Sequence, residues 1–148
     1  MGGLLVRGQW QQKETWEREK DGAFRRQVSS FRQSLGVRDG AMFPPQLDRY
    51  HLYVSLACPW ANRVLMTRNI LGLEDMLPVS TVHHLMLNEG WVFDPEHDDS
   101  GASTEDHLFN YDRMFKVYAH ADDTFTGRVT VPVLWDRCLL YTSPSPRD

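Results

Sequence analysis

The sequence has few cysteines, no long apolar segment and no excess of basic residues. Its two cysteines, Cys58 and Cys138, are too few and too far apart to build a disulfide framework, so a reducing compartment, the cytoplasm, is expected. No apolar run approaches the roughly 20 residues that cross a bilayer. The formal net charge is −4, and no basic face suggests a nucleic-acid partner. We therefore expect neither membrane nor nucleic-acid binding.

The sequence also lacks the ligand spacings of common metal sites. His83 and His84 are adjacent, and with His97 and His107 they match no zinc spacing. The acidic run from Asp94 to Asp99 lacks the alternating oxygen ligands of an EF-hand. We therefore predict no metal, histidines that face solvent, and a solvated acidic loop.

The segment from Arg49 to Gly72 does contain a clear pattern: a strand, a tight turn and a helix. Apolar residues alternate from Tyr50 to Leu56, which is typical of a strand lying against a core. Pro59 suits the first position of a helix, and Gly72 suits the left-handed residue that follows the last turn. The turn therefore places Cys58 at the N-terminus of a helix. The side chains expected on the buried face of that helix are Val64, Leu65, Ile70 and Leu71.

A cysteine at a helix N-terminus is a candidate nucleophile. The first helical turn presents unpaired N–H groups and about half a positive charge, so it favours a thiolate over a thiol. Arg63 is close enough in sequence to add to this effect. The alternative is that Cys58 is a small buried residue that fills space at a strand end, as most lone cysteines do. The strand–Cys–Pro–helix context favours the nucleophile.

Three further segments complete an α/β pattern. Leu77 to Val82 is predicted to form a second strand, giving a β–α–β unit with a right-handed crossover. Thr104 is predicted to cap a helix from about Glu105 to Tyr118. The β-rich run from Arg128 to Trp135 suits a buried strand, although Pro132 inside it removes a ladder donor.

Three sequence blocks resemble the glutathionyl-hydroquinone reductases, the Xi class of the glutathione transferase superfamily. The blocks are YHLYVSLACPWANR at 50–63, GWVF at 90–93 and GRVTVPVLWD at 127–136. They occur in order, and the resemblance runs from about Leu4 to Arg137. One departure is Asn62, where many members have histidine.

The resemblance implies an incomplete thioredoxin-like domain, the N-terminal domain of a glutathione transferase, without the all-helical C-terminal domain. Residues 1–48 would be an N-terminal extension that anchors to it, and 49–137 the partial glutathione-binding domain. Residues 138–148 resemble translated read-through of a sequencing adapter and are interpreted as a non-native tail that supplies no element. We expect residues 131–135 to be an unpaired edge strand and the fragment alone to be inactive.

The resemblance also implies roles for individual residues. A cis-proline beside the cysteine would expose the backbone of the residue before it to the cysteinyl group of glutathione. The catalytic residue would be Cys58, the residues that support the helix start Pro59 and Trp60, and the glutathione-binding residues Trp91, Arg128, Val131 and Pro132.

The motif Cys58-Pro59-Trp60-Ala61 lacks the second cysteine of a Cys-X-X-Cys pair, so a mixed disulfide at Cys58 must be resolved by an external thiol. In the implied cycle, the thiolate attacks the sulfur of a glutathionyl-hydroquinone and expels the hydroquinone. A second glutathione then releases oxidised glutathione. The alternatives are an omega-class-like or glutaredoxin-like thioltransferase, and a non-catalytic thioredoxin-fold binding module. The sequence leaves open the quinone and the oligomeric state, a homodimer of the full-length protein included.

Overall fold

The computed structural model describes residues 2–12, 31, 33–139 and 141–143. No helix in this part of the chain is long and apolar enough to cross a membrane. The elements, in chain order, are β1 (Leu4–Val6), β2 (Gln9–Gln11), β3 (Tyr50–Val54), α1 (Pro59–Ile70), β4 (Val79–Thr81), α2 (Met114–Ala121), β5 (Val133–Asp136) and β6 (Tyr141–Ser143).

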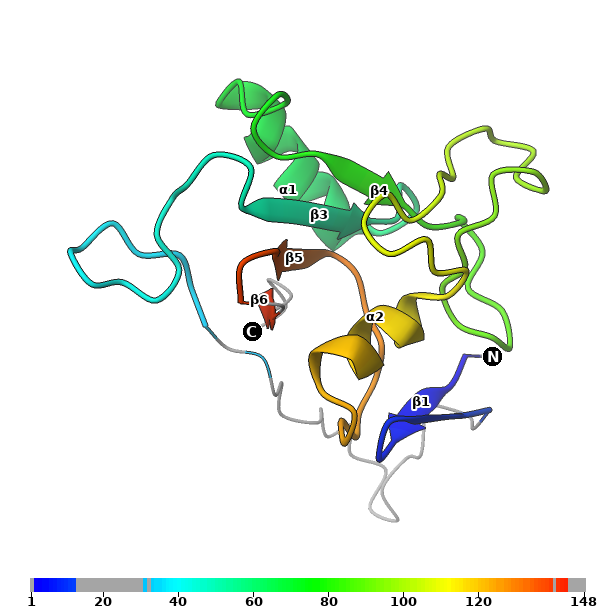
Figure 1. Cartoon of the computed structure of the whole chain (residues 1–148). Coiled ribbons are helices and arrows are strands. Elements are labelled where there is room, and N and C mark those ends of the chain that lie inside the picture. Colours follow the sequence, from blue (N-terminus) through cyan, green and yellow to red (C-terminus); the bar gives the residue numbers. More distant parts are fainter. Residues whose placement is uncertain (1, 13–30, 32, 140, 144–148) are drawn as a thin grey trace, which may run out of the picture.

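The main sheet has the strand order β4-β3-β5-β6 (Figure 1). Strand β3 pairs in parallel with β4 and antiparallel with β5, so the predicted strand–helix–strand unit is confirmed. All five residues of β3 are buried because the strand is central and covered on both faces. The alternation read from the sequence therefore does not reflect a wet face, and Leu56, 56% exposed, lies outside the strand.

The register of β3 and β5 places the two helices on opposite faces of the sheet. Leu52 is directly opposite Leu134, and these two side chains line a hollow together with residues of α1. The next pair along the strands points to the other face, where the Trp135 ring lies 5.7 Å from that of His120 on α2. This arrangement, with α1 and α2 separated by the strands in Figure 1, is that of a thioredoxin-like domain.

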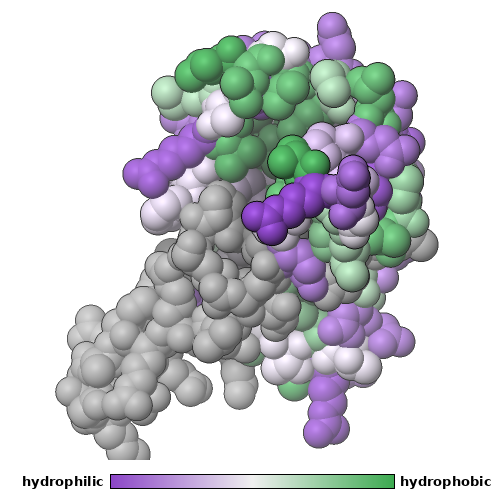
Figure 2. Space-filling model, turned by 90° about the vertical axis from the view of Figure 1, so that its left-hand side faces the viewer, coloured by the Kyte–Doolittle hydropathy of each residue, from purple (hydrophilic) through white to green (hydrophobic). Residues whose placement is uncertain are grey.

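The buried face predicted for α1 is correct at Val64 and Leu65, which are partly buried against the core, and wrong at Ile70 and Leu71, which are exposed. Ala61 is the buried residue of this helix, whereas Ile70 is 78% exposed. Because a helix turns by 100° per residue, Ile70 points away from Val64 and shares a face with Met66, which is 54% exposed. Leu71 lies just past the end of the helix. Figure 2 shows the resulting hydrophobic surface in its upper part, over the end of α1.

Helix α2 begins at Met114, well after the predicted cap at Thr104. The Asp106 carboxylate accepts hydrogen bonds from backbone N–H groups of the segment that follows it, including that of Tyr111 at 3.2 Å. Asn110 adopts a left-handed conformation, with φ of 56°, which a continuous helix does not allow. The hydrogen bonds from nearby backbone N–H groups to the Asp106 carboxylate therefore stabilise a compact loop in place of the predicted helix.

The expectation that β5 is an unpaired edge strand is wrong. Strand β6 pairs antiparallel with it, from Leu134 opposite Ser143 to Asp136 opposite Tyr141. Residues after 137 therefore do supply an element. The pairing uses backbone N–H and C=O groups, and every residue except proline has both. It is therefore compatible with a native or a non-native origin of residues 138–148.

Two residues of the predicted N-terminal extension contact the segment 125–127. Leu5 forms an isolated antiparallel bridge with Gly127, and the Phe31 ring stacks on that of Phe125 with centroids 5.3 Å apart.

The buried histidine of β3, His51, should make the stability of the fold sensitive to acid. His51 is 1% exposed, its Nε2 atom lies 2.8 Å from Ser80 Oγ, and burial lowers its pKa from 6.5 to about 4. The unfolded chain therefore binds a proton at His51 between pH 6.5 and 4 while the folded chain does not. Stability that is present above pH 6.5 is lost as the pH falls through this window.

We expect the free energy of unfolding to fall by about 2–3 kcal/mol between pH 7 and pH 4.5 through this group. Urea denaturation of the wild type and of His51→Gln at both pH values measures it, since the variant should show a smaller fall. His97→Gln is the control, because His97 is exposed and its pKa is raised by a hydrogen bond to Asp94. Equal falls in the wild type and His51→Gln would rule out this account.

Candidate functional site

Cys58 lies where the sequence predicted, between the end of β3 and the start of α1. It is the N-cap residue of α1, with φ of −93° and ψ of 116°, and Pro59 is the first helical residue. A turn from Ser55 to Cys58 sets this position, because the Cys58 N–H donates to the Ser55 carbonyl oxygen at 3.0 Å. Gly72, with φ of 64°, follows the helix in the predicted left-handed conformation. Local backbone rules thus place the sulfur at the positive end of the helix.

The Cys58 sulfur lies against the segment that contains Pro132. The Val131–Pro132 peptide bond is cis, as the resemblance implied, and the Cys58 thiol donates to the Val131 carbonyl oxygen with an Sγ···O distance of 3.4 Å. The expected exposure of the Val131 backbone is not found, because this residue is 1% exposed and its carbonyl oxygen faces the sulfur. Cys58 itself is 4% exposed. The thiol and the cis-proline are therefore brought together, in a closed arrangement.

Trp60 and Arg63 extend this region along the first turn of α1. The Arg63 guanidinium lies over the Trp60 ring, 4.7 Å from its centroid, in cation–π geometry. Both residues line a hollow of about 600 Å³ between α1 and the sheet, and Pro132 lines the same hollow. Trp60 and the cis-proline therefore face the same hollow.

Arg128 and Trp91 lie on two other segments. Arg128 is half-buried and directly follows Gly127, the residue that pairs with Leu5. Trp91 is also half-buried, and its carbonyl oxygen accepts the N–H of Met114 at the start of α2, at 2.9 Å. The described contacts of Trp91 therefore lead to α2, and the structure does not join it directly to the sulfur.

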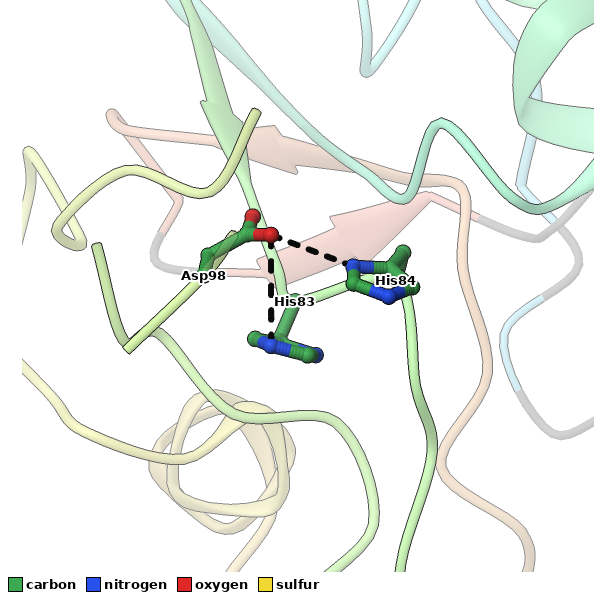
Figure 3. Close-up of side chains that lie close together, drawn as sticks. All are labelled: His83, His84 and Asp98. Atoms are coloured by element: carbon green, nitrogen blue, oxygen red, sulfur yellow. Dashed lines mark hydrogen bonds and ion pairs between the residues drawn. The ribbon is translucent and has the colours of Figure 1, made fainter. Parts of the chain in front are cut away.

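A cluster of two histidines and a carboxylate, which sequence reasoning missed, closes the acidic loop (Figure 3). Asp98 has a fully buried side chain, and its Oδ1 atom lies 3.1 Å from His84 Nδ1 and 3.9 Å from His83 Nε2. The pKa of Asp98 lies below its usual range because Ser100 donates to the carboxylate, which outweighs its burial. The predictions of a solvated loop and of solvent-facing histidines are therefore wrong here, since the side chain of His83 is 13% exposed. The Asp-x-Ser spacing, typical of an Asx turn, was the available signal.

The same three side chains lie close enough to be considered as metal ligands, but their geometry favours hydrogen bonds. The Leu85 N–H donates to His83 Nδ1 at 3.0 Å, so the ring proton is on Nε2, the atom that faces Asp98. The two imidazole rings are stacked, 4.4 Å apart and 22° from parallel. An ion bound in the plane of both rings would require them to turn. As it stands, the cluster ties the beginning of the loop to residue 98.

Comparisons with known proteins give the family. The model of the glutathione S-transferase N-terminal domain matches residues 57–144. Glutathionyl-hydroquinone reductase YqjG of Escherichia coli is 46% identical over 144 residues, which cover 91% of this chain and 42% of the relative. Glutathione S-transferase omega-like 2 of Schizosaccharomyces pombe is 50% identical over 117 residues, which cover 79% and 36%. This chain thus spans about two fifths of the length of these relatives.

Solved structures agree. The Xi-class glutathione transferase of Natrialba magadii superposes with a TM-score of 0.82 at 40% identity, covering 97% of this chain and 41% of that one. The glutathione-bound structure of YqjG gives 0.77 at 39% identity, covering 97% and 42%. The sequence match, the strand order and the cysteine beside a cis-proline lead to one conclusion: the chain belongs to the glutathione S-transferase family, of which it contains the thioredoxin-like N-terminal domain.

Proposed function

We propose that the protein to which this chain belongs reduces glutathionyl-hydroquinones to hydroquinones through a mixed disulfide between Cys58 and glutathione. The observation that carries the proposal is the position of the Cys58 sulfur, at the N-terminus of α1 and 3.4 Å from the carbonyl oxygen next to the cis-proline. A thiolate formed there is stabilised by the unpaired N–H groups of the first helical turn. The names of YqjG and of its glutathione complex support glutathione as the co-substrate.

In the proposed reaction, the Cys58 thiolate attacks the glutathionyl sulfur, and the carbon–sulfur bond of the glutathionyl-hydroquinone breaks. The electron pair of that bond leaves on the hydroquinone carbon, which takes a proton. A second glutathione, as thiolate, then attacks the mixed disulfide, so that oxidised glutathione leaves and the Cys58 thiolate returns. Ala61 provides no internal thiol for this step. Two molecules of glutathione are oxidised, counting the one carried by the substrate, and one quinol carbon is reduced.

The proposed chemistry uses thiols alone, without a metal ion, and suits the cytoplasm, where glutathione is kept reduced. Treatment with EDTA is therefore expected to leave both turnover and mixed-disulfide formation unchanged, as measured on the same preparation before and after dialysis. A loss that added zinc restores would contradict this expectation.

The proposal is tested by exposing this chain to glutathione disulfide and locating the adduct by peptide mass spectrometry. The Cys138→Ser variant provides the background, because Cys138 is exposed and would otherwise react as well. We expect one glutathionyl group, on Cys58, that reduced glutathione removes. No adduct at Cys58 would favour a non-catalytic binding module.

A thioltransferase is the second candidate, favoured by the omega-like name of the S. pombe relative. The full-length protein should be assayed side by side with a glutathionyl-hydroquinone and with a small mixed disulfide of glutathione. Efficient reduction of the mixed disulfide alone would favour the thioltransferase over the reductase.

Arg128 is proposed to bind a glutathione carboxylate through its guanidinium, and Val131, Pro132 and Trp91 to complete the binding site. Arg128→Ala is then expected to raise the KM for glutathione about tenfold, with less than a twofold change in kcat, since charge-assisted hydrogen bonds contribute about 1.5–3 kcal/mol. Arg137→Ala is a matched control. Arg137 directly follows the last residue of β5 and donates to the carbonyl oxygen of Asp48, whereas Arg128 precedes that strand. An unchanged KM in Arg128→Ala would remove Arg128 from the site.

A further inference from the structure

The N-terminal hairpin of β1 and β2 touches the segment that leads into Arg128. Leu5, 0% exposed, exchanges two backbone hydrogen bonds with Gly127, both at 2.9 Å. The tip of the hairpin adds another, from the Gly8 N–H to the Phe125 carbonyl oxygen at 2.9 Å. Gly8 is in the left-handed region, and a Cβ atom there would lie 2.0 Å from the carbonyl oxygen of Asp123. One edge of the hairpin is therefore fixed to residues 123–127.

The other strand of the same hairpin touches the segment that leads into Trp91. The Trp10 indole N–H donates to the Asn88 carbonyl oxygen at 3.3 Å. A Cβ atom on Gly90 would lie 2.8 Å from the Trp10 ring, so the ring rests directly on this backbone. The Trp10 ring also stacks on that of Phe115 of α2, with centroids 4.9 Å apart and planes 12° from parallel.

These two sets of contacts are joined within one short ribbon. Leu5 and Trp10 are cross-strand partners in the β1–β2 pair, so a displacement of one strand displaces the other. The ribbon therefore connects Gly127, one residue before Arg128, to Gly90, one residue before Trp91. In Figure 1 it lies beside α2, away from α1.

We propose that Trp10 is a positioning residue of the glutathione site, and that the hairpin holds the segments preceding Trp91 and Arg128 at a fixed spacing. This inference rests on the proposed function, because it takes those two residues as glutathione contacts. Both follow their anchoring points, Gly127 and Gly90, by a single peptide unit, so looseness at the anchor becomes looseness at the contact. Keeping binding groups fixed before the ligand arrives avoids the entropy cost of ordering them.

The proposal is tested on this chain by calorimetric titration with reduced glutathione and by hydrogen exchange of peptides that cover residues 85–93 and 124–131. Trp10→Ala is expected to weaken glutathione binding by about tenfold and to speed exchange in both peptides, because both anchors loosen. Trp10→Phe, which can still stack on Phe115 but lacks the indole N–H, should restore most of the affinity.

Phe43→Ala is the matched control, since it also removes a buried aromatic ring but lies outside the hairpin and both segments. It should leave glutathione affinity within twofold and leave exchange in both peptides unchanged. Unchanged exchange at residues 124–131 in Trp10→Ala, or a loss of affinity in Phe43→Ala equal to that in Trp10→Ala, would overturn the inference.

Arg128→Ala separates the two levels of the proposal. If Arg128→Ala weakens glutathione binding and Trp10→Ala does not, the positioning role of Trp10 is refuted while the glutathione site stands. If Arg128→Ala has no effect on affinity, the proposed site fails, and the exchange data still decide whether the hairpin holds the two segments together.

Discussion

Replacing Cys58 with serine is expected to abolish mixed-disulfide formation with glutathione and to lower turnover of the full-length protein by on the order of 10³-fold or more. A serine hydroxyl is far less ionised than a thiol at neutral pH and forms no disulfide. The backbone should be unaffected, because residue 58 is the N-cap of α1 and serine is a preferred residue there. The side chain of Cys58 does not cap the helix, so serine can add a hydrogen bond.

The measurement combines peptide mass spectrometry, glutathionyl-hydroquinone turnover and thermal unfolding of the same variant. Cys138→Ser should behave like the wild type in all three. We expect the melting temperature of Cys58→Ser to be unchanged or slightly raised. Substantial turnover in a folded Cys58→Ser variant would show that another residue carries the chemistry.

Breaking the buried ion pair between Arg49 and Asp136 should cost about 3–5 kcal/mol of unfolding free energy, since one partner is left as an uncompensated charge. Arg49 donates two hydrogen bonds to one carboxylate oxygen of Asp136, at 2.8 and 2.6 Å, and the Asp136 side chain is 1% exposed. The other oxygen accepts the N–H groups of Cys138 and Leu139. Burial alone would raise the pKa of Asp136, but these hydrogen bonds, led by that from Arg49, lower it.

Asp136→Asn isolates the charge, because asparagine keeps an oxygen for the two backbone N–H groups. Urea denaturation should show the full loss in Asp136→Asn and a partial recovery in the double variant Arg49→Met with Asp136→Asn, which no longer buries an unpaired guanidinium. Exposed Asp99→Asn serves as the control and should change stability by less than about 0.5 kcal/mol. A double variant that is less stable than Asp136→Asn would argue against an uncompensated charge as the cause.

Local rules were sufficient for the region around the sulfur. The N-cap at Cys58, Pro59 in the first turn and the left-handed Gly72 all depend on neighbours in sequence, and all were confirmed. The cis bond at Pro132 was different. Sequence physics alone predicts trans for an X–Pro bond, and only the resemblance to a thioredoxin-like family supplied the cis prediction.

Two of the errors, the helix predicted after Thr104 and the solvated acidic loop, arose where a buried carboxylate binds groups that are distant in the chain or in irregular backbone. Asp106 accepts the Tyr53 hydroxyl at 2.8 Å from the central strand, and this contact, 53 residues apart in the chain, stabilises a loop in place of the predicted helix. Asp98 similarly organises a loop that composition alone marked as solvated. Helical periodicity cannot detect either contact, because it reports only the spacing of apolar residues within one segment.

The N-terminal ribbon was predicted as an anchor but not as a link between two segments. Trp10 lies among polar residues in the sequence, and nothing near it indicates that its ring rests on Gly90. The contact depends on a glycine far away in the chain that leaves room for an indole. Such pairs are visible only once the fold brings them together.

The bridge between Leu5 and Gly127 also bears on how the chain folds during its synthesis. Leu5 leaves the ribosome first, and its partner follows 122 residues later (127 − 5). At a synthesis rate of about 5–20 residues per second, the Gly127 backbone is made on the order of 6–24 s after Leu5. We therefore expect the pairing of Leu5 with Gly127 to be a late, long-range event that follows the formation of the β3–α1–β4 unit.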